Sequence, residues 1–220
     1  MRDRLGALKW RAWHAFDHWN ERRLGIDTSG EIKPEELGFA PGGEDYRGGL
    51  YRPSSWVVLR HIFKTLRATA EDVFVDYGSG KGRVLILAAQ QSFKRVTGVE
   101  MSEDLNRVAR ENVERNRDRF RSGGVEVLTA DATQWPVPDD VTIAYFFCPF
   151  PPHVFDEVLR QLFASLARRP RRLRLVYYYM SDADRELLMA TGRAKQLEYK
   201  RPWHLRKQLS ELWMFELVPG

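Results

Sequence analysis

Apolar and polar positions follow two different rhythms along the chain. In residues 3–24 and 54–66 the apolar side chains recur three and four positions apart, which is the spacing of amphipathic helices. Residues 25–50 between them are rich in glycine, proline and acids, as expected of a connector. These features predict an N-terminal helical extension, serving as a lid, at residues 1–66, followed by a larger domain at residues 67–220.

In that larger domain, short strand-like runs alternate with helical ones. The predicted strands are residues 72–76, 95–100, 125–130, 141–147, 172–179, 194–200 and 211–218. The predicted helices are residues 80–91, 103–119, 153–167 and 182–190. Such alternation implies a parallel sheet with right-handed crossovers, and the last two strands, which lack a helix between them, are expected to pair antiparallel. The predicted fold class is α/β: a seven-stranded, mostly parallel sheet with helices on both faces, a terminal antiparallel strand and the N-terminal helical extension.

Composition narrows the class of protein. Hydrophobic residues make up 43% of the 220 and charged residues 30%, which excludes wholesale disorder and a collagen-like chain. No apolar run approaches the roughly 20 residues that a membrane span needs, and the N-terminus lacks the features of a secretory signal. We therefore expect no membrane partner and a cytoplasmic location. The single cysteine, Cys148, excludes an internal disulfide, and no histidine spacing suggests a metal site.

The formal net charge of +5 comes mostly from arginines in short clusters, such as those of residues 159–174. A basic balance can indicate a nucleic-acid partner. Here the tryptophans are not interleaved with the basic clusters, as base-stacking platforms would be. The arginines are therefore interpreted as a solvated surface, and a nucleic-acid partner is not expected.

The most informative segment is residues 73–83, with the sequence VFVDYGSGKGR. A strand ends in Asp76, and Gly78, Gly80 and Gly82 then permit positive φ and close approach of a ligand before a helix opens. Dinucleotide sites space their glycines as G-x-G-x-x-G, and a carboxylate beside a pyrophosphate would be repulsive. The segment therefore favours a nucleoside that bears an amino acid, whose ammonium group an acid would attract.

The pattern D-x-G-x-G-x-G after a first strand resembles the signature of class I S-adenosylmethionine-dependent methyltransferases, and residues 72–218 have a similar order of strands and helices. The resemblance implies S-adenosyl-L-methionine as the cofactor. It also implies that Glu100, in GVEMS, binds the ribose hydroxyls, and that Asp131, in TADAT, faces the adenine amino group. Carboxylates can accept these hydrogen bonds. Each acid ends a predicted strand, where open α/β sheets bind their ligands.

A full cofactor site follows from this resemblance. Its predicted members are Tyr51, Asp76, Gly78, Ser79, Gly80, Gly82, Glu100, Met101, Asp131, Ala132 and Cys148. The sequence also resembles the nucleosome-acting, non-SET lysine methyltransferases, in which a stretch with tyrosine and proline before the first strand helps to close over the cofactor. Tyr46, Tyr51, Pro53 and Ser54 are the local counterparts.

The predicted acceptor side follows the fourth strand. Many N-methyltransferases carry (N/D)-P-P-(Y/F) there, and Cys148-Pro149-Phe150 resembles a shorter variant with a thiol at the amide position. A thiol is a weak hydrogen-bonding group, so we expect Cys148 to supply shape and a soft apolar wall, while backbone carbonyls could anchor the acceptor. Alignment and desolvation can drive methyl transfer, and a base is needed only for a poor nucleophile. His153, at a helix start, and Tyr179, at a strand end, are the candidate bases.

Several functions remain open. The leading hypothesis is a methyltransferase acting on a nitrogen or oxygen of a small molecule, with residues 1–55 and 148–153 shaping an aromatic acceptor pocket. An acid-rich stretch at residues 26–45 favours the alternative of a protein lysine or amine terminus. Nucleic-acid methylation ranks third, a cofactor-binding module without catalysis is a separate class, and an NAD-type oxidoreductase ranks last. The helix at residues 3–24 could form a homodimer.

Overall fold

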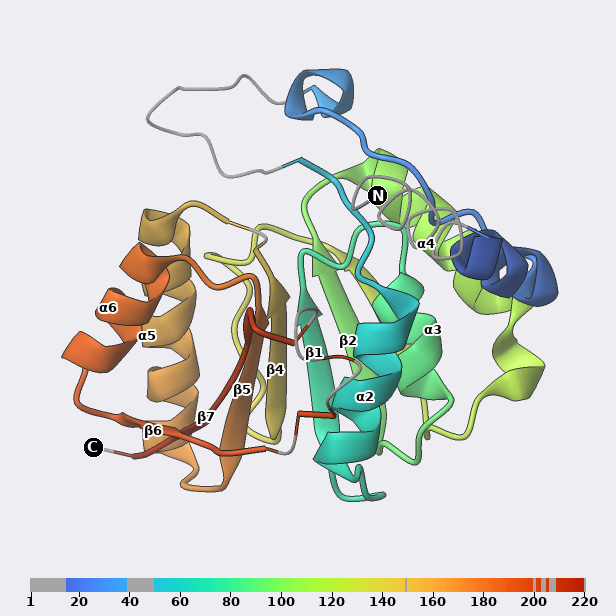
Figure 1. The fold of residues 1–220 in the computed structure, drawn as a ribbon. Helices are drawn as coiled ribbons and strands as arrows, with labels where there is room; N and C mark the ends of the chain where they lie inside the picture. The colour runs from blue at the N-terminus through green and yellow to red at the C-terminus, as the bar shows by residue number, and fades with distance from the viewer. Residues whose placement is uncertain are drawn as a thin grey trace, which may run out of the picture.

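A seven-stranded sheet forms the centre of the molecule (Figure 1). This computed structural model describes residues 15–38, 50–148, 150–199, 201–202, 205 and 209–219. In chain order the strands are β1 (Val73–Tyr77), β2 (Arg95–Glu100), β3 (Val125–Thr129), β4 (Ile143–Phe147), β5 (Leu173–Tyr178), β6 (Ala194–Gln196) and β7 (Leu212–Leu217). Their spatial order is β3-β2-β1-β4-β5-β7-β6. Strands β1 to β5 are parallel, whereas β7 runs antiparallel to β5 and β6, which confirms the predicted fold class.

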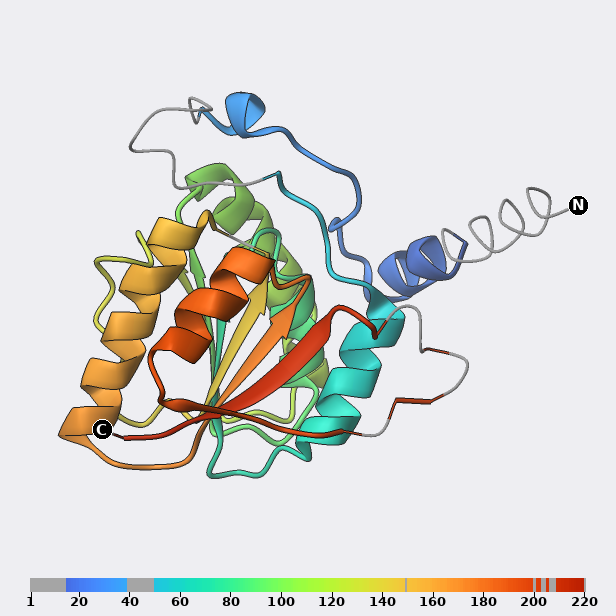
Figure 2. The same ribbon diagram turned by 60° about the vertical axis from the view of Figure 1, so that its left-hand side comes forward.

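Helices cover both faces of the sheet, and each face has its own apolar core (Figure 2). One core lies under α2 (Trp56–Leu66), α3 (Arg83–Ala89) and α4 (Glu103–Arg115). The other lies under α5 (Pro152–Arg168) and α6 (Asp182–Ala190). Residues 15–24 are also helical, and two short 3₁₀ turns occur, η1 (Pro34–Leu37) and η2 (Arg117–Arg119).

Strand β1 is buried on both faces, as central parallel strands are. Its packing on both sides holds the residues at its carboxyl end in a fixed position. Phe74 points into the core under α2 and α3, and Val73, Val75 and Tyr77 point into the core under α5 and α6. By the two-residue period of a strand, Asp76 faces the same side as Phe74. Asp76 is the penultimate residue of β1, just before the glycine turn, and it is 2% exposed.

Most predicted element boundaries lie within two residues of those in the structure, and three differ by three or four residues. Helix α3 starts at Arg83 rather than residue 80, because Gly80 and Gly82 have φ values of 52° and 82°, which a right-handed helix excludes. Helix α4 ends at Arg115, where the Asn116 side chain donates to the Leu24 carbonyl at 3.0 Å. Strand β6 is shorter than predicted and ends at Gln196.

Other predictions meet the structure only in part. Residues 15–24 confirm the end of the predicted N-terminal helix, whereas the rest of it lies outside the described residues. The division at residue 66 stays a prediction, and α2, on its N-terminal side, packs into the core. None of the described helices is both long and apolar enough to span a membrane.

Candidate functional site

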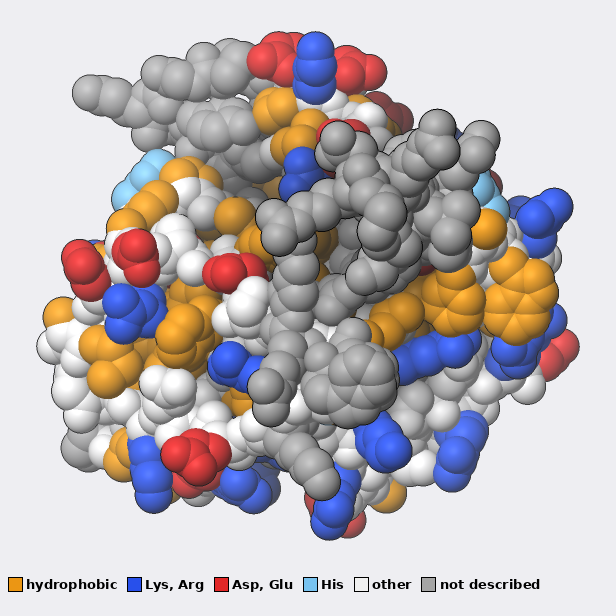
Figure 3. Space-filling view, viewed as in Figure 1, with side chains coloured by type: hydrophobic (Ala, Val, Ile, Leu, Met, Phe, Trp, Pro, Cys, Tyr) orange, Lys and Arg blue, Asp and Glu red, His pale blue; other side chains and the backbone are white. Residues whose placement is uncertain are grey.

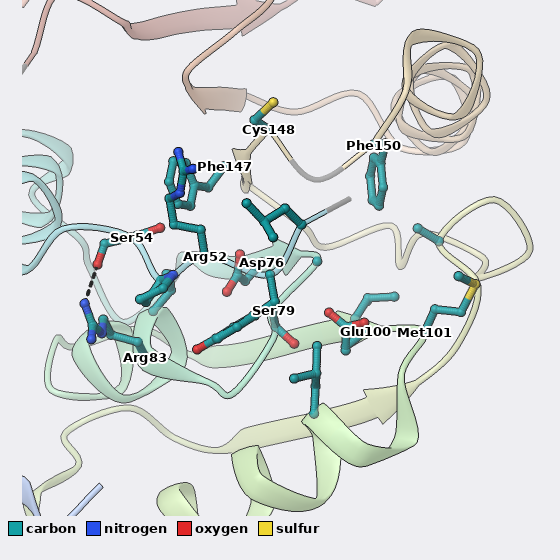
Figure 4. A pocket seen from close by; sticks show the side chains of 18 of the residues that line it. Arg52, Ser54, Asp76, Ser79, Arg83, Glu100, Met101, Phe147, Cys148 and Phe150 are labelled. Atoms are coloured by element: carbon teal, nitrogen blue, oxygen red, sulfur yellow. Dashed lines mark hydrogen bonds between the residues drawn. The ribbon is translucent and has the colours of Figure 1, made fainter. Parts of the chain in front are cut away.

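A cleft opens where the carboxyl ends of β1, β2 and β4 meet (Figure 4). It encloses about 930 Å³, including space open to solvent. Most of the predicted cofactor residues line it together. They are Tyr51, Asp76, Gly78, Ser79, Glu100, Met101, Asp131, Ala132 and Cys148. Five separate segments of the chain thus converge on one site, as the resemblance implied.

Asp76 is the unusual group of this cleft. Its residue is 2% exposed, and no described residue hydrogen-bonds its buried Oδ2 atom. Burial raises the pKa of Asp76 well above its usual value, and the negative charge of Glu100 raises it further. A buried carboxylate without a partner is costly, so it marks a place where a ligand can supply a cation.

Glu100 faces the same cleft from the end of β2 and is better supported. Its Oε2 accepts from the Gly80 amide at 3.0 Å, and its Oε1 accepts from the Ser102 amide at 2.9 Å. Burial nevertheless raises the pKa of Glu100, because those amides only partly offset the lost hydration. A carboxylate has about four lone-pair positions, so Glu100 can still accept hydrogen bonds from a ligand diol.

Asp131 lines the cleft beyond β3, where the chain turns. Its Oδ1 accepts from the Thr133 amide at 2.9 Å and from the Thr133 hydroxyl at 2.7 Å. These bonds fix the orientation of the carboxylate toward the cleft wall. The three acids predicted from the sequence therefore share one cavity, at the ends of adjacent strands.

The predicted glycines Gly80 and Gly82 lie outside the lining and shape the turn instead. A Cβ on Gly80 would come within 2.5 Å of the Tyr51 ring, and one on Gly82 within 3.1 Å of the Ala109 side chain. Tyr51 therefore packs directly on the turn. Its hydroxyl donates to the Thr28 carbonyl at 2.7 Å, and its backbone pairs with Ile32 in a two-residue antiparallel bridge.

We call residues 26–32 and 50–54 together the strap, because they lie side by side over the glycine turn (Figure 1). Asn112 of α4 fastens it, since its amide accepts from the Asp27 N–H at 3.1 Å and donates to the carbonyls of Asp27 and Lys81, each at 3.0 Å. Arg83 fastens it from α3, donating to the Thr28 hydroxyl at 2.9 Å and the Ser54 carbonyl at 3.0 Å.

The acceptor end of the cleft is apolar. Its lining residues are Leu37, Leu50, Phe147, Cys148, Phe150 and Val154. Phe147 stacks on Tyr178 with ring centroids 5.1 Å apart, which fixes one wall. Cys148 turns the chain at the end of β4 with a positive φ of 41°, and desolvation raises the pKa of its thiol. This end therefore offers an apolar wall rather than an acid or a base.

The two candidate bases are not brought to this cavity. His153 is exposed on the first turn of α5, and Tyr179 is 47% exposed, with its ring packed on Phe147 and Tyr178. Neither is among the described residues that line the cleft. Their catalytic roles stay predictions.

The aromatic acceptor pocket predicted from residues 1–55 stays a prediction. Tyr51 lines the cleft, whereas Phe16 and Trp19 stack on each other elsewhere. The other predicted aromatics lie outside the described residues. Conversely, the sequence reasoning missed Leu50, Arg52 and Phe147, because these residues belong to no motif and enter the cleft only through the fold.

Comparisons with known proteins agree with this geometry. A family model described as a methyltransferase domain matches residues 74–171. A protein-lysine N-methyltransferase of Saccharolobus islandicus (strain REY15A) is 33% identical over 67 residues, which are 30% of this chain and 42% of that protein. The chain thus matches less than half the length of this curated relative.

Two solved structures share the fold. An RNA methyltransferase from Salinibacter ruber, in complex with S-adenosyl-L-homocysteine, has a TM-score of 0.55 at 18% identity, covering 76% of this chain and 94% of that one. An S-adenosylmethionine-dependent methyltransferase from Methanosarcina mazei has a TM-score of 0.53 at 14% identity, covering 73% and 98%.

Sheet order and the solved structures show the Rossmann-like α/β fold that is found in class I S-adenosylmethionine-dependent methyltransferases. The methyltransferase-domain family model matches residues 74–171 of this chain. The cleft fits the cofactor of this class, because the partnerless Oδ2 of Asp76 suits its ammonium group. Glu100 and Asp131 would hold the ribose and the adenine.

Proposed function

We propose that this protein transfers a methyl group from S-adenosyl-L-methionine to a nitrogen or oxygen of a small-molecule acceptor. The observation that supports a methyl donor is the buried carboxylate of Asp76, whose Oδ2 has no partner among the described residues, in one cleft with Glu100 and Asp131. When bound, the cofactor supplies an electrophilic methyl group on a sulfonium. The chain's own part is to bind, align and exclude water.

A small acceptor is supported by the apolar end of the cleft. The walls formed by Phe147, Phe150, Leu37 and Leu50 would desolvate a compact, partly apolar molecule. Among the described residues that line this end, none is an acid. A cationic lysine would therefore find no side chain there that could take up its charge.

Protein methylation is the second candidate, and it rests on the 33% identity to a protein-lysine N-methyltransferase over 67 residues. A nucleic-acid acceptor is not favoured, because the positively charged side chains on the face shown in Figure 3 do not gather around the cleft. On that face, most of the Lys and Arg side chains lie in the lower half. In the same view in Figure 1, the carboxyl ends of the parallel strands point to the upper half.

The test has two stages. Calorimetric titration should show micromolar binding of S-adenosyl-L-methionine and S-adenosyl-L-homocysteine and none of NADH. Formation of S-adenosyl-L-homocysteine is then followed with a panel of small amines, phenols and carboxylic acids, and in parallel with lysine-containing proteins. Turnover with proteins alone would replace this proposal by the second candidate, and binding without any turnover would favour a module without catalysis.

A further inference from the structure

Two arginines line the described part of the cleft, Arg52 and Arg83, and only one of them is available to a ligand. Arg83 is 3% exposed, and each of its nitrogens has a partner. Nε donates to the Thr28 hydroxyl, Nη1 to the Ser54 carbonyl and Nη2 to Glu21, at 2.9, 3.0 and 3.0 Å. All three nitrogens of this guanidinium are therefore engaged within the protein, and none is available to a ligand.

Arg52 is in the opposite situation. Its Nε donates to the Glu31 carboxylate at 2.7 Å, and no described residue hydrogen-bonds its two terminal nitrogens. Figure 4 shows its side chain in the cleft, beside Phe147. Its side chain is 56% exposed, so the terminal nitrogens can meet a ligand without displacing a core contact. Glu31 holds the guanidinium plane from the Nε side and leaves the far edge open.

The cofactor's own chemistry determines what this free edge would meet. An ammonium that pairs with Asp76 sits on a carbon that also bears a carboxylate, so the two charged groups enter the same part of the cleft. Asp76 and Glu100 would repel that carboxylate. A guanidinium, in contrast, presents two parallel N–H groups that match the two oxygens of a carboxylate.

We propose that Arg52 binds the α-carboxylate of the cofactor's methionine moiety, so that Asp76 and Arg52 together recognise its amino-acid end. This assignment rests on the proposed function. Arg52 is thus a specificity-determining residue contributed by the strap, outside the segment that matches the methyltransferase-domain family.

The experiment compares S-adenosyl-L-methionine with its decarboxylated analogue, which keeps the ammonium and the sulfonium but lacks the carboxylate. Wild-type protein should bind the cofactor at least about tenfold more tightly than the analogue, as a charged hydrogen-bonded pair predicts. In Arg52→Gln that preference should fall close to one, because cofactor affinity drops while analogue affinity stays within about twofold. Arg52→Lys should lie between the two, since it keeps the charge without the planar fork.

Arg107→Gln is the matched control. Arg107 is also an exposed arginine paired with a glutamate, Glu111 at 3.2 Å, but it lies on α4 outside the cleft. Both affinities should remain at the wild-type level in this variant. A general effect of losing one positive charge would appear here as well.

The outcomes separate the two proposals. An equal loss of affinity for cofactor and analogue in Arg52→Gln would mean that Arg52 only supports the strap, and an unchanged preference would mean that the carboxylate binds elsewhere; either overturns the assignment. Failure of the wild-type protein to bind the cofactor, its demethylated product or the analogue would overturn the proposed function itself.

Discussion

Two buried carboxylates in the N-terminal half of the chain, Glu21 and Asp76, differ in their hydrogen-bond partners and in the direction in which their pKa is shifted. Glu21 accepts from the Thr28 amide at 3.0 Å, the Thr28 hydroxyl at 2.7 Å and Arg83 at 3.0 Å, and also from the Ser29 hydroxyl. Burial opposes its ionisation, but these donors prevail and hold its pKa below the usual value. Asp76 has an oxygen with no described partner, and burial raises its pKa.

The difference separates a carboxylate that holds the structure from one that is kept for a ligand. Both carboxylate oxygens of Glu21 accept hydrogen bonds from Arg83 or from the strap. Its role is therefore to stabilise the folded state. Asp76 is left in an environment that disfavours its charge until a cation arrives. A perturbed pKa in a cleft can therefore be interpreted only together with the list of partners around the group.

The largest effect on stability is expected when the ion pair between Arg83 and Glu21 is broken. Arg83→Met should lower the free energy of unfolding by about 3–5 kcal/mol, because Glu21 would be left buried without its cation. Urea unfolding measures the loss. Glu21→Gln in the same chain should recover part of it, as a coupled pair requires. A cost below about 1 kcal/mol would show that the cluster does not fasten the strap.

A smaller effect is expected at Asp76, where a substitution should weaken ligand binding without lowering stability. Asp76→Asn should weaken binding of S-adenosyl-L-methionine by at least about 100-fold, which is about 2.7 kcal/mol. The same variant should unfold at equal or higher urea concentration than wild type in the absence of ligand, because it removes a buried charge that lacks compensation. Calorimetry and urea unfolding test both halves, and unchanged affinity would remove Asp76 from the site.

The two acids should also respond to pH with opposite signs. Asp76 has a raised folded pKa, so the native state binds more protons than the unfolded chain. Its contribution to stability is greatest in acid and is lost as the pH rises through the raised folded pKa. Glu21 has a lowered folded pKa, so its contribution is present above the unfolded value and is lost as the pH falls through the folded one.

Unfolding measured across the pH range in wild type and Asp76→Asn tests this sign. The difference between the two proteins should change by at most about 1.4 kcal/mol per pH unit, above the ordinary carboxyl range near 4. A flat difference would show that Asp76 titrates as an ordinary surface acid. Cofactor affinity should move the other way and weaken in acid, as Asp76 becomes protonated.

The smallest effect is expected at the acceptor end. Cys148→Ser should leave cofactor affinity within about twofold, because the thiol supplies shape rather than a hydrogen bond. Turnover is the quantity that can change. A complete loss of cofactor binding in this variant would place Cys148 in the cofactor half of the cleft, contrary to the proposed layout.

The sequence analysis predicted the parts of the site that obey local rules. Asp76, Glu100 and Asp131 end or follow strands, and parallel strands bring their carboxyl ends together, so their convergence followed from the order of elements. Arg52 and the Glu21–Arg83 pair depend on contacts between distant segments, for which no spacing rule exists.

Tyr179 shows a different limit. Strand alternation cannot tell where its ring points, because its φ of 58° takes the residue out of the extended conformation. The same limit applies to the start of α3, where two glycines with positive φ delay the helix.

The packing of Tyr51 on Gly80 has a consequence for the binding reaction itself. Since the ring rests on the turn that supports Glu100, docking of the strap and occupation of the cleft share one surface. Thermodynamic reciprocity then applies: if a docked strap tightens the cofactor by some factor, the cofactor tightens the strap by the same factor. In that case the strap reports whether the cleft is occupied. Its protection from proteolysis should rise with cofactor concentration along the binding isotherm of the cofactor.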